Sequence, residues 1–189
     1  MRKIMMVVRF RRRRERKTNY KVRLALLKSN TPRLVIRPSL KNIIIQLVEY
    51  DPAGDKILFT CSSRQLVKLG WKGGRKSLPA AYLTGLLCKN KIKKGTKAIL
   101  DVGNYTLTKG GTIYAALKGA IDAGLDIACS PEIFPSQERL TGKHIEDYAK
   151  VIKDTEKYKK QFSNYLKQNI DPANISKMFE EVKNKILAK

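Results

Sequence analysis

Apolar and polar residues alternate along much of residues 33–63, and this spacing is typical of β-strands. Three runs show it: RLVIRPS (33–39), NIIIQLVEY (42–50) and KILFTCSS (56–63). A short turn around Leu40 and Lys41 separates the first two runs, and DPAGD (51–55) separates the second from the third. The pattern therefore predicts an antiparallel three-strand meander.

The first of these strands is predicted to have two unlike faces. Successive side chains of a strand point to opposite sides of the sheet, so Leu34 and Ile36 share one face. Arg33, Val35 and Arg37 share the other face. An outward face that carries arginine is a surface that a backbone phosphate can use.

A short helix is predicted before the meander, over residues 18–28. Thr18 is placed as its N-cap, and Val22, Leu26 and Leu27 form an apolar stripe. The sequence SNTP follows, and it ends the helix because the residue before a proline is pushed out of the helical region.

Helices and strands alternate after the meander. The predicted order is a helix that begins near Pro79, a buried strand over 98–103, a helix over 112–124 and a short strand near 125–130. The second helix is rich in alanine and glycine, which permits close packing on a sheet. Strands followed by alternating elements predict a mixed α/β (α+β) class, in which helices pack on a mixed β-sheet.

Three parts are expected along the chain. Residues 1–30 form a basic amino-terminal extension with the short helix, 31–130 a mixed α/β core domain, and 131–189 a loop and a helical carboxy-terminal extension. Within the last part, 130–142 is predicted to be loop, and polar amphipathic helices follow, split at Asp171 and Pro172. A chain of 189 residues suffices for one such domain with extensions.

Charge is concentrated at the amino end. The net charge is +24, and residues 1–41 hold 15 basic residues and one acidic residue. Self-repulsion of this size destabilises an isolated compact chain, so a polyanionic partner is expected, and RNA phosphate suits arginine well. Phe10 and Tyr20 bracket the basic run and are predicted to stack on exposed bases. The alternative for the run is a disordered, solvated tail.

No membrane partner is expected. The longest strongly apolar stretches, such as IIIQLV (43–48), fall far short of the roughly 20 residues that a membrane span requires. The amino terminus does not fit a signal peptide, so a cytoplasmic protein is predicted. Cys61, Cys88 and Cys129 form no CxxC pair and are expected as buried or partly buried free thiols.

The sequence offers no catalytic set, and no cofactor or metal ion is expected. His144 is the only histidine, and Arg75 interrupts the P-loop pattern in GWKGGRKS. One enzymatic alternative stays open: a metal-dependent nucleic-acid-processing enzyme that uses Asp101 together with other scattered carboxylates, namely Asp51, Asp122 and Asp126. A DNA-compacting basic protein is disfavoured by the large mixed core.

Several stretches resemble one family of ribosomal proteins. In chain order they are RRRRERKTNYKVRLALLKSNTPRLVIRPSLKNIIIQLV, GWKGGRKSLPAAYLTGLL, LDVG, ALKGAIDAGLDI and GKHIEDY, within roughly residues 9–150. They resemble the large-subunit ribosomal proteins of the universal L-eighteen family, called L-five in eukaryotes, and the archaeal form most of all. The resemblance implies a structural constituent of the ribosome that binds 5S rRNA and anchors it in the central protuberance. It also implies contact with 23S-type rRNA and with neighbouring ribosomal proteins.

The resemblance also indicates which residues bind RNA. It implies the arginine-rich segment, the outward strand face and the GWKGGRK loop, to which the basic run and the short helix add Arg9 and Arg23. The predicted RNA-binding residues are Arg9, Arg11, Arg12, Arg13, Arg14, Arg16, Lys17, Thr18, Asn19, Tyr20, Arg23, Arg33, Arg37, Trp71, Lys72 and Arg75. Ala128 and Cys129 depart from the Pro-His pair expected of the family, and residues after about 150 match it only loosely.

Overall fold

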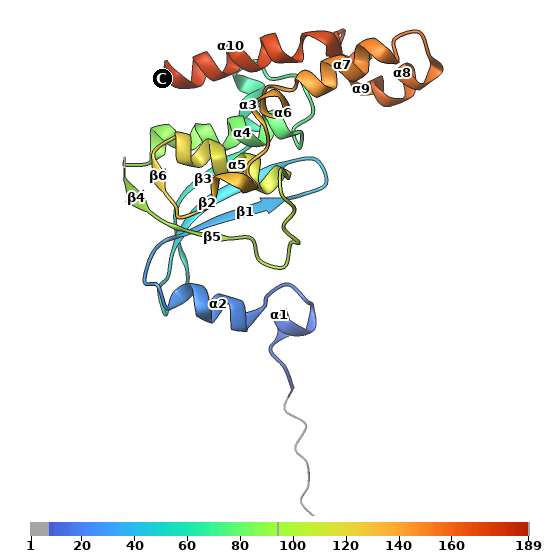
Figure 1. The fold of residues 1–189 in the computed structure, drawn as a ribbon. Coiled ribbons are helices and arrows are strands. Elements are labelled where there is room, and N and C mark those ends of the chain that lie inside the picture. Colours follow the sequence, from blue (N-terminus) through green and yellow to red (C-terminus); the bar gives the residue numbers. More distant parts are fainter. Residues whose placement is uncertain (1–7, 94, 189) are drawn as a thin grey trace, which may run out of the picture.

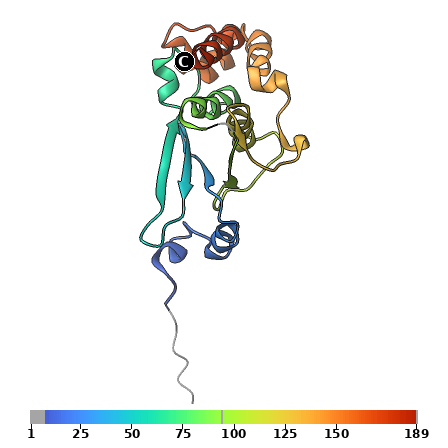
Figure 2. The ribbon, with the colours of Figure 1, turned by 90° about the vertical axis from the view of Figure 1, so that its left-hand side faces the viewer.

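A four-stranded sheet lies at the centre of the computed structural model, which describes residues 8–93 and 95–188. Helices cover one face of the sheet, and the amino-terminal segment lies on the other (Figures 1 and 2). The strand order is β3 (Lys56–Ser62), β2 (Ile43–Glu49), β1 (Arg33–Pro38), β5 (Ile99–Asp101). The first three are antiparallel and β5 runs parallel to β1. The predicted meander and the mixed α/β class are confirmed.

The two faces of β1 differ as the alternation predicts. Leu34 and Ile36 are fully buried on the face that packs against the helices. Val35 pairs with Gln46 and Arg37 pairs with Ile44 on the opposite face, which we call the open face. A register shift at Leu47 and Val48 interrupts the pairing of β2 with β3.

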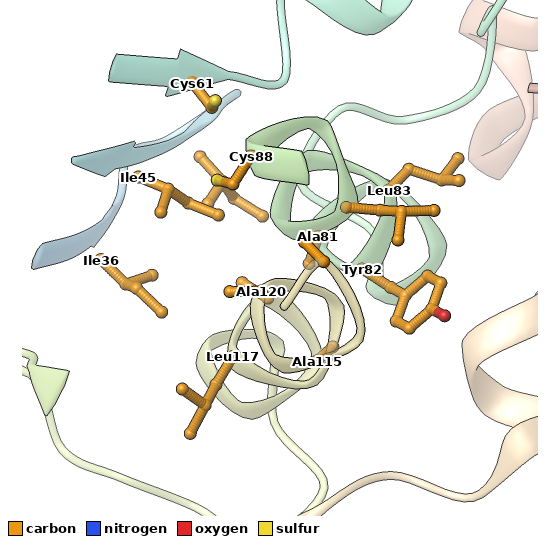
Figure 3. Close-up of a cluster of buried hydrophobic side chains, with 14 of the residues drawn as sticks. Ile36, Ile45, Cys61, Ala81, Tyr82, Leu83, Cys88, Ala115, Leu117 and Ala120 are labelled. Carbon is orange, nitrogen blue, oxygen red and sulfur yellow. The ribbon is translucent and has the colours of Figure 1, made fainter. Parts of the chain in front are cut away.

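Two helices pack tightly on each other above the sheet. They are α4 (Leu78–Leu86), which has Ser77 as N-cap and Pro79 in its first turn, and α5 (Thr112–Asp122). A side chain at Gly85 would overlap the Ala116 carbonyl, and one at Gly119 would overlap the Tyr82 carbonyl. The small residues of α5 were expected to bring it close to a sheet, but these contacts bring it against α4. Figure 3 shows the core between this helix pair and the strands.

The remaining elements after β3 are mostly short, apart from the 13-residue helix α10. They are α3 (Gln65–Lys68), β4 (Thr96–Lys97), β6 (Leu125–Asp126), α6 (Gln137–Thr141), α7 (Lys143–Val151), α8 (Glu156–Gln161), α9 (Ser163–Leu166), α10 (Ile175–Leu187) and 3-10 turns at Leu87–Lys91, Pro131–Ile133 and Pro172–Asn174. The short strand predicted near residue 125 is confirmed as β6, which pairs with β4. The loop predicted over 130–142 is wrong in part, because α6 and a 3-10 turn lie there.

The carboxy-terminal helices close the helical side of the molecule. Ile175, Phe179, Val182 and Ile186 of α10 belong to the main core, so this segment packs on the sheet domain (Figure 1). The predicted split at Asp171 and Pro172 is confirmed. The helix predicted before it is broken into α7, α8 and α9, because the chain folds back to bury Ala149, Ile152 and Phe162 in a small cluster of their own.

The three cysteines differ in their exposure. Cys61 and Cys88 are buried as expected, whereas Cys129 is exposed. Residues 1–7 of the predicted amino-terminal extension lie outside the described residues, and the boundaries of the three predicted parts stay a prediction.

Replacement of Gly85 by alanine is expected to destabilise the fold, although alanine is the better helix former by about 1 kcal/mol. The added methyl group meets the backbone of α5, and such overpacking costs about 1–3 kcal/mol. Chemical denaturation measures the loss. Gly74→Ala is the control, because the nearest atom to its added methyl group lies 3.6 Å away, and equal stability of the two variants would contradict the helix contact.

Candidate nucleic-acid interface

The basic run folds into an arm that lies over the open face. We define the arm as residues 8–30, with α1 (Arg11–Arg14) and α2 (Tyr20–Leu27). The rings of Phe10 and Tyr20 pack on each other with centroids 5.3 Å apart, rather than standing apart to meet bases. The run is thus a folded turn and not the extended tail of the alternative hypothesis.

The start of α2 differs from the prediction by one residue. Asn19 is the N-cap, and its Oδ1 accepts hydrogen bonds from the backbone N–H groups of Lys21 and Val22 at 3.1 and 3.3 Å. Thr18 was predicted there, but its hydroxyl accepts a hydrogen bond from Arg12 Nε at 2.8 Å instead. Thr18 and Asn19 therefore shape the arm.

Most guanidinium groups of the arm are available to a partner. Glu15 is the only acid of the basic run, and it pairs with Lys17 at 2.8 Å and with Arg11 at 3.7 Å. The exposed arginines without a carboxylate partner among the described residues are Arg9, Arg12, Arg13, Arg14 and Arg16. Five unpaired positive charges within eight residues repel one another, which favours binding of a polyanion.

A chain of ion pairs fastens the arm to the sheet. Arg23 of α2 bonds Asp55 in the turn between β2 and β3 at 2.8 Å, and Arg33 bonds the same carboxylate at 2.7 Å. Asp101 on β5 bonds Arg33 at 2.7 Å and Arg37 at 2.8 Å. We call these five residues the arginine–aspartate chain. It connects the arm to β1, to β5 and to the turn between β2 and β3.

Asp101 is held in its charged form. Burial by itself raises the pKa of this carboxyl, but the hydrogen bond and charge of Arg37 oppose it, with smaller help from the Gly103 N–H and from Arg33. The net result is a pKa below the ordinary value for aspartate. A carboxylate with a lowered pKa stabilises the fold only while it stays ionised.

The structure changes the role of two predicted phosphate ligands. Arg33 lies on the outward strand face as expected, yet it is only 3% exposed, because the arm covers it and two carboxylates bind its guanidinium. Arg37 is half-buried, and besides Asp101 Oδ1 it bonds the carbonyl oxygens of Ile36 and Asp101. Buried charges require such partners. Arg33 thus positions the arm and presents no surface to RNA here.

A second basic surface surrounds the loop of residues 70–77. It forms a hollow of about 570 Å³ whose charged lining residues are Lys41, Lys72, Arg75 and Lys76, with no acid among the lining residues. The loop is held by a contact with α9, since Tyr165 Oη accepts a hydrogen bond from the Gly74 N–H at 2.9 Å. Lys72 is exposed and Arg75 is half-buried, so both side chains reach the surface.

Trp71 in the same loop has a different place from the one the resemblance implies. It is 1% exposed, and its indole N–H points to the Gly74 carbonyl at 3.4 Å. The ring belongs to the main core, so it supports the loop and does not stack on bases.

Three residues of these surfaces escaped the sequence reasoning. Lys41 and Lys76 flank predicted elements, and only their basic character marks them. Asn104 donates a hydrogen bond to the Arg16 carbonyl at 2.6 Å and so fixes the part of the arm that follows α1. No local pattern reveals that partnership, because 88 residues separate the two.

The carboxylates of the enzymatic alternative do not come together. Asp101 is bound by two guanidinium groups, whereas Asp122 accepts hydrogen bonds from Tyr82 and Lys118 at 2.9 and 3.1 Å. Within residues 8–93 and 95–188 there is no group of three or more His, Cys, Asp or Glu residues that could hold a metal ion.

In the same ranges no helix has the length and apolar character needed to cross a membrane.

The structure is that of a mixed α/β protein, with helices on one face of the sheet and an exposed arginine-rich arm on the other. Residues 5–97 match the family model described as "Ribosomal large subunit proteins 60S L5, and 50S L18". This match covers 93 of the 189 residues and supports a large-subunit ribosomal protein of this family. The protein is therefore a structural component of the large ribosomal subunit, and its expected location in the ribosome is confirmed.

Replacement of Asp55 by asparagine is expected to loosen the arm, because Arg23 and the buried Arg33 lose a charged partner. We expect a loss of about 2 kcal/mol in the free energy of unfolding and faster hydrogen exchange of the α2 amides. Asp51→Asn in the same turn is the control, since its side chain only accepts a hydrogen bond from the Ala53 N–H and asparagine keeps that acceptor. Unchanged hydrogen exchange of the α2 amides in Asp55→Asn would show that the arginine–aspartate chain does not hold the arm on the sheet.

The contribution of Asp101 is expected to depend on pH. Its pKa is lower in the folded state than in the unfolded state, where it is about 3.9. The stabilisation is therefore complete above about pH 4 and disappears as the pH falls further. The stability gap between the wild-type protein and Asp101→Asn, measured by denaturation from pH 7 to pH 3, should narrow at the acidic end. A constant gap would mean that the charge of Asp101 is irrelevant.

Proposed function

We propose that this protein binds 5S rRNA and anchors it in the central protuberance of the large subunit. The observation that carries the proposal is the folded arm, whose five exposed arginines have no carboxylate partner among the described residues. The family match supplies the ribosome as the setting. The choice of 5S rRNA, the central protuberance and the archaeal type is supported by the resemblance of the sequence stretches alone.

Different residues of the predicted set take different parts in this binding. Arg9, Arg11, Arg12, Arg13, Arg14, Arg16 and Lys17 contact phosphates, because they are exposed on the arm. Thr18, Asn19, Tyr20, Arg23 and Arg33 hold the arm in shape and in place. Lys72 and Arg75 contact RNA from the second basic surface, which is suited to 23S-type rRNA or to another part of the same RNA. Neighbouring ribosomal proteins complete the set of partners.

The protein acts without catalysis in this proposal. Asp101 is the best-placed carboxylate of the enzymatic alternative, and its oxygens are committed to Arg33, Arg37 and the Gly103 N–H. A divalent ion would have to displace two guanidinium groups to reach it. Incubation of the protein with Mg²⁺ and labelled RNA is expected to leave the RNA intact.

The double variant Arg13→Ala, Arg14→Ala tests the arm. Each lost phosphate contact reduces the magnitude of the slope of log affinity against log salt by about 0.7–0.9, so the loss of two contacts is expected to reduce it by roughly 1.4–1.8. Binding to labelled 5S rRNA between about 0.1 and 0.4 M salt, with excess transfer RNA as competitor, measures it. The control variant Lys159→Ala, Lys160→Ala on α8 removes the same charge far along the chain.

The salt slope and the competition with transfer RNA test two separate claims: that the arm contacts phosphate, and that 5S rRNA is the specific partner. If the arm variant and the control have equal slopes, then the arm does not contact phosphate. If transfer RNA displaces the wild-type protein completely, then charge alone drives binding and 5S rRNA is not the specific partner.

A further inference from the structure

A groove of about 300 Å³ lies between the arm and the open face of the sheet. Its floor is apolar and comes from three strands: Val35 of β1, Val48 of β2 and Ile57 of β3. Val22 and Leu26 of α2 form the wall on the arm side. None of the residues of α2 is fully buried, so the arm does not close this groove by apolar packing.

The charges around the groove are unequal. Arg12, Lys17, Arg23, Arg33 and Arg37 line it, against two acids, Asp55 and Asp101. The two carboxylates are taken up by the arginine–aspartate chain. Arg12 makes no ion pair among the described residues, and with Lys17 it leaves the rim positive, which suits a phosphate group.

A polar group with unused hydrogen-bonding capacity lies beside the apolar floor. Gln46 donates its amide N–H to Thr60 Oγ1 at 3.1 Å, and its carbonyl oxygen has no hydrogen-bond partner in the described part of the chain.

We propose that this arm–sheet groove binds a single unstacked nucleotide of an RNA, and the proposal rests on RNA binding by the arm. The base lies over Val35, Val48 and Ile57, and the Gln46 carbonyl oxygen offers a hydrogen-bond acceptor to its edge. The phosphate lies at Arg12 and Lys17. A site of this volume is at the small end of ligand pockets, which suits one nucleotide and excludes a duplex.

The physical argument is that irregular RNA presents such nucleotides. Bases in loops and bulges are splayed out of the helix, and proteins bind them by apolar contact and by hydrogen bonds to their edges. Exposed arginines recognise phosphate regardless of sequence, whereas a groove with a fixed hydrogen-bond acceptor distinguishes bases. The groove thus adds base selection to the charge of the arm.

Val35→Phe is the direct test, because it fills the floor without a change of charge. The probes are a mixed-sequence single-stranded RNA of eight nucleotides, the same sequence as a duplex, and 5S rRNA. We expect Val35→Phe to weaken single-strand binding at least tenfold, with the salt slope and the duplex affinity unchanged. Ile44→Phe is the matched control: Ile44 lies on the same face, is 38% exposed and does not line the groove.

A second variant controls for the possibility that the larger side chain of Val35→Phe displaces the arm. Gln46→Leu adds no volume and removes the acceptor, so it should weaken single-strand binding several-fold and alter the preference among oligomers of A, C, G and U. Hydrogen exchange of α2 shows whether the arm of either variant stays docked. If both variants bind single-stranded RNA as the wild-type protein does, the groove does not bind a nucleotide.

This result is independent of the identity of the ribosomal RNA. Wild-type protein that fails to prefer 5S rRNA over transfer RNA refutes the proposed partner, while the oligonucleotides still decide on the groove. Wild-type protein that prefers 5S rRNA, together with variants that bind single strands normally, refutes the groove and leaves the proposed function standing.

Discussion

Two aspartates decide whether the amino-terminal arm lies on the sheet. The chain carries a net charge of +24, and the arm faces a strand with two arginines of its own. Without Asp55 and Asp101 between them, these like charges would drive the arm away. With them, Arg23, Arg33 and Arg37 are each bound to a carboxylate at 2.7–2.8 Å. The open face, the groove and the presentation of the exposed arginines all depend on this arrangement.

The same interaction divides the arginines into two groups. The arginines near Asp55 and Asp101 form ion pairs with these carboxylates. The arginines of α1 are exposed to solvent, and Glu15 is the only acid near them. Residue type therefore does not decide function in this segment. The position of a few carboxylates does, since a guanidinium that is already paired gains little from phosphate and would leave a buried charge behind if it moved.

Local patterns in the sequence predicted what depends on neighbours in the chain. The alternation of residues 33–63 gave the meander and the faces of β1, and Pro79 and the helical spacing after it gave α4. Contacts between distant segments were beyond such patterns. Arg33 meets Asp101 across 68 residues, and Trp71 is covered by a core to which α10 contributes more than 100 residues later. The need for glycine at positions 85 and 119 likewise follows only from the close contact of α4 with α5. Hence the basic character of the arm was evident from the sequence, whereas the burial of Arg33 and Trp71 was not.

The way in which the arm is held has a consequence for binding. α2 has no fully buried residue, so charge and hydrogen bonds, rather than apolar area, keep the arm on the sheet. Partly exposed pairs such as Arg23 and Asp55 are weakened by salt. A polyanion that binds only the docked arm stabilises it by mass action. Salt thus opposes RNA binding twice, once at the phosphates and once at the arm, and the two effects separate only when the docking of the arm is measured without RNA.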